Sequence, residues 1–286
     1  MFVEVNGARL FFDVEGSGLV PDGPRMRVKP TLLLLHGGPG FDHTGYKPAF
    51  SELADIVQVV YLDHRGNGRS SGEDRSTWNL ARWGDDVRAF CDVLGIDKPI
   101  VYGASFGGMV ALAYATQHPG YPGKLILVST EAAGHSHLER RVALFERLGG
   151  PEVGALARRR FLDRKLDPET LETWVRLAFP VYTRKRRDPQ AMQRAIRHPE
   201  VNHWFARPGG EGHTFNFFPT LSNIQCPTLV LGGEDDPMLP IECQEDLVAA
   251  LPAHLVRFER FPNCGHSVIA DAPLRAFAVI RDFIEH

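Results

Sequence analysis

The chain has 286 residues and a formal net charge of −3, from 32 basic and 35 acidic side chains. This near balance gives no reason to expect nucleic acid or a membrane surface as a partner, and a hydrophobic content of 43% is ordinary for a globular protein with a sizeable core. The N-terminus shows no secretory signal pattern and the longest apolar runs are strand-sized, so we expect a cytoplasmic protein without a membrane span.

The four cysteines are scattered along the chain without the spacing of metal ligands. They are Cys91, Cys226, Cys243 and Cys264. We expect them to be buried as small hydrophobic side chains in a reducing compartment. The sequence therefore predicts no metal site, and we expect no cofactor.

The N-terminal part predicts a β-hairpin, because the turn pair Asn6-Gly7 separates two strand-like runs, Phe2–Val5 and Arg9–Val14. A loop rich in glycine and proline is expected over Glu15–Pro30. The next run, Thr31–Leu35, is uninterruptedly apolar after its first residue, as in a central parallel strand that is covered on both faces.

Two structured loops follow the next strands. His36–Gly40, of sequence HGGPG, exposes backbone N–H groups at a strand's carboxyl end, and we interpret it as half of an oxyanion hole rather than as a plain turn. A further strand is expected over Ile56–Leu62, followed by a loop over Asp63–Ser70. Its Asp63 and His64 could be mistaken for catalytic groups, but we expect them to hold the loop. The Asn79–Leu94 segment fits an amphipathic helix.

The pattern Gly-x-Ser-x-Gly spans Gly103–Gly107, between a strand-like run, Ile100–Tyr102, and a helical pattern of small residues, Phe106–Gln117. This is the signature of a sharp strand-to-helix turn that holds a serine, here Ser105, at its apex. A Cβ at either glycine would collide with neighbouring elements. The alternative is a glycine-rich turn that contains a serine by chance. We predict Ser105 as a nucleophile, and a further strand over Lys124–Ser129.

The segment 131–217 is helical and charged, and it carries an excess of basic residues while the remainder of the chain is net negative. Its expected helices are Val142–Leu148, Gly154–Phe161, Pro168–Phe179 and Pro189–Ile196. We expect a helical cap (lid) over the carboxyl edge of the sheet, inserted into a core of residues 1–130 and 218–286. Two basic clusters, Arg158–Arg160 and Arg184–Arg187, predict solvated helix faces and turns; the alternative is a basic rim that attracts acidic substrates.

Strand and helix alternate again after this segment. Strands are expected over Pro227–Leu231 and His254–Phe258, and helices over Ile241–Ala250 and Pro273–Ile284. An acidic loop follows the first of these strands. A tight loop over Asn263–Ser267 follows the second strand and contains a histidine.

Chain order unites three of these features. A serine at an elbow, an acid after a later strand and a histidine after the last strand give the order Ser105, Asp236, His266, all at carboxyl ends of strands. His266 would accept the serine proton, and Asp236 would fix its tautomer and stabilise the imidazolium. Asp235 is adjacent but should point away. Glu131 follows an earlier strand from which some such enzymes take their acid, so it is the rival to Asp236.

Five segments together resemble the proline iminopeptidase branch of the α/β-hydrolase fold. They are HGGPG at His36–Gly40, DHRGNGRS at Asp63–Ser70, GASFGG at Gly103–Gly108, GEDDPMLP at Gly233–Pro240 and GHS at Gly265–Ser267. The resemblance covers the core and implies an α/β-hydrolase fold, with a mostly parallel eight-stranded sheet flanked by helices and an inserted helical cap. It also implies an oxyanion hole from the N–H groups of Gly38 and Phe106.

The cap departs from the pattern of that branch, in which a Trp/Glu-rich segment comes early and cap glutamates hold the substrate's free amine. Here the early cap, Leu138–Arg147, contains two glutamates but no tryptophan. Trp174 and Trp204 come later, each near a glutamate. The candidates for substrate contact are Gly37, Trp174, Tyr182 and Trp204.

The sequence thus predicts a cofactor-free serine hydrolase that cleaves a small amide or ester through an acyl-enzyme. On the resemblance, we expect an aminoacyl amidase or peptidase of the iminopeptidase type. The alternatives are a carboxylesterase or lactonase without aminopeptidase activity, and a non-catalytic small-molecule receptor on the same fold. A dehalogenase or epoxide hydrolase would need an aspartate where Ser105 stands. The expected partner is a small-molecule substrate, and the expected oligomeric state is a monomer or a homodimer.

Overall fold

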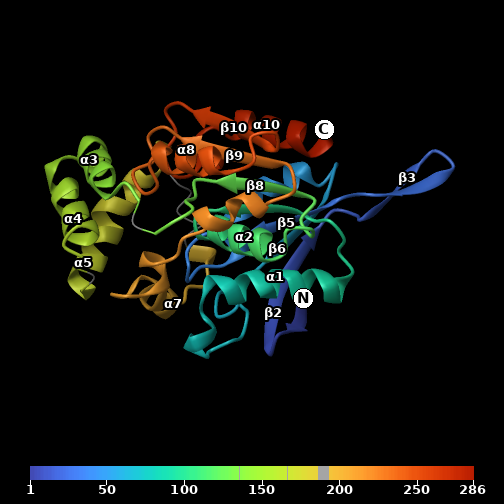
Figure 1. Ribbon diagram of the computed structural model, residues 1–286, viewed down its shortest axis with the longest axis horizontal. Helices are drawn as coiled ribbons and strands as arrows, with labels where there is room; N and C mark the ends of the chain where they lie inside the picture. The colour runs from blue at the N-terminus through green and yellow to red at the C-terminus, as the bar shows by residue number, and fades with distance from the viewer. Residues whose placement is uncertain (135, 166, 186–192) are drawn as a thin grey trace.

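The structure, a computed structural model, describes residues 1–134, 136–165, 167–185 and 193–286. At its centre is an eight-stranded sheet with the strand order β1-β2-β6-β5-β7-β8-β9-β10 (Figure 1). The strands are β1 (Phe2–Val5), β2 (Ala8–Glu15), β5 (Thr31–Leu35), β6 (Gln58–Leu62), β7 (Ile100–Ala104), β8 (Lys124–Val128), β9 (Thr228–Gly233) and β10 (Val256–Phe261). β2 runs antiparallel to β1 and β6, and the other pairs are parallel. The predicted fold class is confirmed.

Helices cover both faces of the sheet because its central strands are apolar on both sides. In β5, Leu33 and Leu35 belong to one buried cluster, and Leu32 and Leu34 belong to the other. The first cluster includes residues of α1 (Leu80–Leu94), α2 (Phe106–Gln117) and α8 (Ile241–Ala250), and the second includes residues of α10 (Pro273–Glu285). The apolar run at β5 therefore marks a central strand, as predicted.

Local sequence signals account for the ends of several elements. The predicted hairpin is present: β1 pairs with β2 through Asn6-Gly7, whose φ angles are 48° and 76°. Helix α1 begins after Asn79, whose side chain accepts the Arg82 N–H at 2.8 Å. It ends at Gly95, which has a φ of 65°.

The expected loop over Glu15–Pro30 is wrong in part, because it contains a second hairpin of β3 (Leu19–Asp22) and β4 (Arg25–Val28). This hairpin turns at Gly23, where φ is 59°, and extends away from the body of the molecule (Figure 1). Its side chains are mostly exposed. A strand pair without a buried face carries no clear hydrophobic alternation, so the pattern gave no sign of it.

Strand β10 begins and ends later than the strand expected over His254–Phe258. A short helix, α9 (Val268–Asp271), precedes α10 and was not predicted. Single helical turns cover His43–Tyr46, Ala49–Leu53, Arg75–Thr77, Glu211–His213 and Phe218–Asn223. The four cysteines are buried and unpaired. Within the described ranges, no helix combines the length and the apolar character needed to span a bilayer.

The segment 131–217 contains α3 (Leu138–Gly149), α4 (Pro151–Phe161), α5 (Pro168–Thr173) and α7 (Pro199–Ala206). The expected helix over Pro168–Phe179 changes geometry partway, to a wide turn over Trp174–Ala178 and a tight one over Phe179–Tyr182. Pro180 lacks an N–H and cannot continue the α-helical hydrogen bonding. The first half of the expected helix over Pro189–Ile196 lies outside the described residues, and α7 was not predicted.

This segment packs in two parts. Residues of α3, α4 and the turns after α5 form their own hydrophobic cluster around Phe145 and Trp174, and these helices lie together at one side of the sheet (Figure 1). Val201 and Phe205 of α7 belong instead to the cluster that contains α1 and α2. Both parts contribute walls to one cavity, which Ser105 also lines.

Candidate active site

Ser105 lies at the turn between β7 and α2, with a φ of 53° and a ψ of −121°, a conformation that residues other than glycine rarely adopt. The turn is held by two hydrogen bonds in series. Thr130 Oγ1 donates to the Ser105 carbonyl at 2.8 Å, and Gln244 Nε2 donates to the Thr130 carbonyl at 2.7 Å. Within the described part of the chain, the Ser105 hydroxyl makes no hydrogen bond to a protein group. The turn therefore leaves this hydroxyl free beside the cavity.

The glycines on either side of Ser105 leave no room for a side chain. A Cβ at Gly103 would lie 2.3 Å from the Gly107 carbonyl oxygen, and one at Gly107 would lie 2.0 Å from the carbonyl oxygen of Leu35.

We predict that Gly107→Ala lowers the free energy of unfolding by about 3 kcal/mol, because the obstructing atoms are backbone. Thermal unfolding measures this against Gly45→Ala, where an added Cβ meets nothing within 4 Å. Equal Tm values for the two variants would contradict the close approach.

His266 and Asp236 are held together in the loops after β10 and β9. Asp236 Oδ2 lies 2.8 Å from His266 Nδ1, and the carboxylate is fully buried. Its other oxygen accepts the N–H groups of Met238 and Leu239 at 2.8 and 2.9 Å. The His266 N–H donates to the Tyr182 carbonyl at 2.6 Å. Because an ionised carboxylate only accepts, the neutral imidazole of His266 would carry its proton on Nδ1 and have its lone pair on Nε2.

The two rival carboxylates have other partners. Glu131 Oε2 accepts from Arg141 at 2.6 Å and from the Ser136 hydroxyl at 2.5 Å. Burial raises the pKa of Glu131, although Arg141 acts in the opposite direction. Asp235 accepts from Arg147 at 2.6 Å at the surface. Of the three acids considered from the sequence, the structure brings only Asp236 to His266.

The N–H groups expected to bind an oxyanion belong to Gly38 and Phe106, and both residues line the same cavity as Ser105. Phe106 is the first residue of α2, so its N–H has no acceptor within the helix. Gly38 has a φ of 138°, which is open to glycine and strained for other residues. Among the described residues, neither N–H donates to a protein acceptor. Two free donors therefore lie beside the serine.

The cavity beside Ser105 has a volume of about 140 Å³. Its apolar walls include Met109, Phe161, Phe205, Phe215, Met238 and Leu239. Its polar groups are Glu131, Arg141, Arg160, Arg164, Asn202 and His213. An apolar cavity with a few polar groups is typical of a small-molecule site. No cluster of three or more metal-binding side chains occurs in the described ranges.

None of the four predicted substrate-contacting residues is among the described residues that line this cavity. Trp174 is buried against Phe145, with 4.8 Å between ring centroids, and its indole N–H donates to the Tyr182 hydroxyl at 3.0 Å. The Tyr182 ring lies 5.6 Å from the His266 ring. Both aromatic residues thus pack behind the wall, where they support the loop that carries His266.

Gly37 and Trp204 also lie outside the cavity lining as it is described. A Cβ at Gly37 would be 3.6 Å from the Ser105 Cβ, so this glycine lies next to Ser105. Trp204 packs against the main core, with the Arg207 guanidinium 3.5 Å from its ring centroid.

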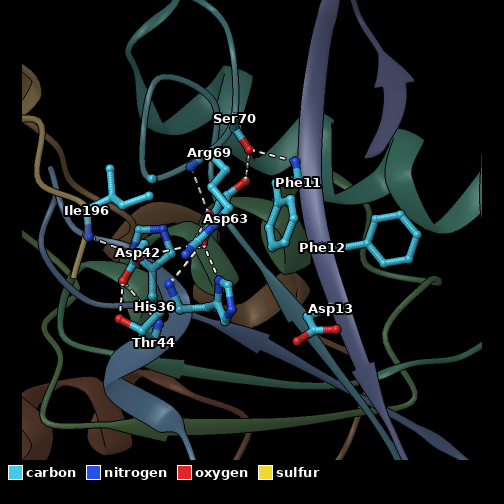
Figure 2. Close-up of polar contacts among 12 residues, drawn as sticks. Phe11, Phe12, Asp13, His36, Asp42, Thr44, Asp63, Arg69, Ser70 and Ile196 are labelled. Atoms are coloured by element: carbon cyan, nitrogen blue, oxygen red, sulfur yellow. Dashed lines mark hydrogen bonds and ion pairs between the residues drawn. The ribbon is translucent and has the colours of Figure 1, made fainter. Parts of the chain in front are cut away.

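Asp63 is the centre of a buried network that joins several loops (Figure 2). Its carboxylate accepts from the backbone N–H and the ring Nδ1 of His43 at 2.9 and 2.7 Å, and from the Arg69 N–H at 2.9 Å. Burial acts to raise the pKa of Asp63, but the hydrogen bonds from His43 and Arg69 and the nearby imidazoles together outweigh it, so the pKa lies below its usual value. Asp42 accepts the Ile196 N–H at 3.1 Å, which ties the segment 131–217 to this network (Figure 2).

His64 is buried beside His36, with 4.3 Å between the ring centroids. The His64 N–H donates to His36 Nε2 at 3.2 Å, and burial lowers the pKa of both imidazoles. The two imidazoles contact loop backbone and each other, and the His64 ring also packs edge-on against Phe106 with 5.6 Å between centroids. The prediction that Asp63 and His64 hold their loop is therefore confirmed.

Sequence reasoning did not place Arg141 or Arg164 at the cavity, and it gave a basic rim that includes Arg160 only as the alternative. The cluster Arg158–Arg160 was predicted to be solvated, and Arg158 is indeed 57% exposed, but Arg160 lines the cavity. Helical spacing held a usable signal, because Arg160 comes three and four residues after the buried Ala157 and Leu156 and so shares their face. In the second cluster, Arg184 and Lys185 are exposed, and residues 186 and 187 lie outside the described part.

A mostly parallel sheet with a serine elbow after β7, an acid after β9 and a histidine after β10 defines the α/β-hydrolase class. The family model described as "alpha/beta hydrolase fold" matches residues 30–273, and the chain belongs to this family. This match confirms the prediction that the protein is an α/β-hydrolase enzyme.

Known proteins resemble this chain over nearly its whole length. It is 26% identical over 287 residues to a putative carbamate hydrolase RutD of Caulobacter sp. (strain K31), covering 96% of this chain and 95% of that protein. It is 27% identical over 279 residues to a proline iminopeptidase of Lactobacillus helveticus (strain DPC 4571), covering 90% of each. The crystal structure of a proline iminopeptidase of Mycobacterium smegmatis superposes with a TM-score of 0.81 at 22% identity, covering 100% of this chain and 97% of that one. The resemblance to the proline iminopeptidase branch is confirmed.

Proposed function

We propose that the protein is a serine hydrolase in which Ser105 attacks the carbonyl carbon of a small ester or amide. The observation that carries this proposal is the 2.8 Å contact between Asp236 Oδ2 and His266 Nδ1. With Nδ1 protonated toward the carboxylate, Nε2 keeps the lone pair that a general base needs. The small cavity beside Ser105 restricts the substrate to a small molecule.

In this mechanism His266 takes the Ser105 proton as the serine oxygen bonds to the carbonyl carbon. The oxyanion that forms accepts from the N–H groups of Gly38 and Phe106. Collapse of the tetrahedral intermediate breaks the bond to the leaving group, which takes the proton from His266, and leaves an acyl-enzyme. Water then attacks the acyl carbonyl with His266 as base, which releases the acid and restores Ser105. Asp236 stays ionised throughout and stabilises the imidazolium.

We propose that residues 131–217 act as the cap of this site and control substrate choice rather than chemistry. Arg160, Phe161, Asn202 and Phe205 from this segment form much of the cavity wall. A wall of this kind excludes water from the reacting centre and shapes the acyl or leaving-group pocket. The proposed catalytic residues all come from outside the segment.

An ester or a non-peptide amide is favoured over the aminopeptidase alternative. Binding of a free substrate amine needs an available carboxylate, and Glu131, the only carboxylate among the described lining residues, is bonded to Arg141. The glutamates near the cap tryptophans, Glu172 and Glu200, are exposed and outside the lining. The similarity to a proline iminopeptidase and to a putative carbamate hydrolase supports hydrolysis without selecting one substrate.

We expect protein treated with a chelator to hydrolyse para-nitrophenyl butyrate, because the proposed mechanism uses no metal. Proline para-nitroanilide should be no better a substrate than its N-acetylated analogue, since no free carboxylate awaits the amine. Values of kcat/KM for the three compounds test both points. A clear preference for the free amine would favour an aminopeptidase, and no turnover of any ester would favour a non-catalytic receptor.

A further inference from the structure

The walls of the Ser105 cavity carry more positive than negative charge. The described lining residues include three arginines, Arg141, Arg160 and Arg164, against one carboxylate, Glu131. We propose that the substrate carries a carboxylate, separated from the scissile bond by an apolar spacer, and that Arg160 binds it with Arg164 beside it. This inference rests on the proposed function, because it concerns the same cavity.

One arginine and the single glutamate neutralise each other. Arg141 donates to Glu131 Oε2 at 2.6 Å, and the two side chains are only 5% and 6% exposed. Separating such a buried pair leaves an uncompensated charge and is strongly unfavourable. Glu131 is therefore not available to bind a cationic substrate, and Arg141 is not available to bind an anionic one.

Arg160 has no such partner. Its guanidinium lies 4.4 Å from the Trp174 ring centroid and 5.8 Å from that of Phe161, and it makes no hydrogen bond or ion pair with any described residue. Burial lowers the pKa of Arg160; the nearby Arg141 acts in the same direction, and Tyr182 acts in the opposite one. A partly buried cation without an anion is costly, and an anionic ligand would offset that cost.

Stacking on Trp174 does not by itself account for Arg160. A cation–π contact uses the face of the guanidinium and leaves its N–H edge without acceptors. A planar guanidinium held on an aromatic ring is also pre-organised to bind a carboxylate through two parallel hydrogen bonds. Trp174 therefore positions the group, and the cavity supplies the space for its acceptor.

Arg164 adds a second positive charge to the lining of the same cavity. It follows α4, is exposed, has a φ of 54°, and makes no ion pair or hydrogen bond within the described residues. The other residues that line the cavity include the apolar side chains of Met109 and Phe205. A ligand that fits this arrangement has a reactive carbonyl, an apolar spacer and a terminal carboxylate.

The test compares matched esters that differ only in the terminal group. On the acyl side these are para-nitrophenyl hexanoate and the mono-para-nitrophenyl ester of adipic acid, with the enzyme-free rate subtracted. On the leaving-group side they are phenyl butyrate and para-carboxyphenyl butyrate. The readout is the ratio of kcat/KM for the anionic ester to that for the neutral one. Intrinsic reactivity cancels when this ratio is compared between variants.

We expect Arg160→Gln to lower this ratio about tenfold to a hundredfold on one of the two sides, which is the range for a hydrogen bond to a charged group. Arg160→Lys should retain part of it. Arg164→Gln, at an exposed position where unfolding is not expected, should lower the ratio in the same direction by less. Arg158→Gln is the control, because Arg158 lies on the same helix outside the cavity lining and should leave the ratio unchanged.

An unchanged ratio on both sides for Arg160→Gln and Arg164→Gln would overturn the inference while leaving neutral ester hydrolysis, and hence the proposed function, intact. If no neutral ester were cleaved, the proposed function would fail separately. Calorimetric titration with adipate would then test carboxylate binding by Arg160 independently of catalysis. We expect Arg160→Gln to weaken adipate binding about tenfold or more, and equal Kd values for wild type and variant would contradict it.

Discussion

Replacing Ser105 by alanine should lower kcat for the best neutral ester by a factor on the order of 10⁶, because the variant has no nucleophile to form the acyl-enzyme. The fold should remain, since alanine at the elbow removes one oxygen that makes no hydrogen bond to described protein groups. Steady-state kinetics and thermal unfolding measure the two effects together. Ser76→Ala, at an exposed position away from the cavity, is the matched control. A Ser105→Ala variant within about tenfold of wild type would place the nucleophile elsewhere.

Asp236→Asn should lower kcat by a factor on the order of 10⁴. The amide can donate to His266 Nδ1, which favours the tautomer with its proton on Nε2 and removes the lone pair that takes the serine proton. The neutral side chain also no longer stabilises the imidazolium. Kinetics on one neutral ester, with circular dichroism to confirm folding, measure this loss.

Glu131→Gln is the comparison that separates the two candidate acids. Glu131 is bonded to Arg141 and Ser136 rather than to His266, so its loss should reduce stability more than it reduces kcat. If Glu131→Gln removed more activity than Asp236→Asn, the acid would belong to the loop after β8. The assignment of the loop after β9 would then be wrong.

Much of the fold followed from short-range signals. The Asn6-Gly7 turn, the apolar run at Thr31–Leu35 and the glycines around Ser105 each impose a local geometry that the structure contains. The pairing of Asp236 with His266 was also predictable, because parallel strands bring their carboxyl ends to one edge of the sheet.

The cavity wall could not be predicted in the same way. Part of it comes from separate helices of the segment 131–217, of which α7 packs on the main core while α4 packs with α3. The partner of Glu131 is likewise set by the position of α3, which carries Arg141. Such contacts depend on long-range packing; helical spacing can indicate which face of α4 Arg160 shares, but not that this face borders the Ser105 cavity.

The central claim is that Ser105 is the nucleophile of a hydrolytic site, and covalent labelling tests it most directly. The protein is treated with phenylmethylsulfonyl fluoride, the adduct is located by peptide mass spectrometry, and residual ester hydrolysis is followed in parallel. The account predicts a single adduct on the peptide that contains Ser105, formed at the rate at which activity is lost, and no adduct in Ser105→Ala. An adduct on another residue that tracks the loss of activity, or full labelling of Ser105 in an enzyme that remains active, would contradict it.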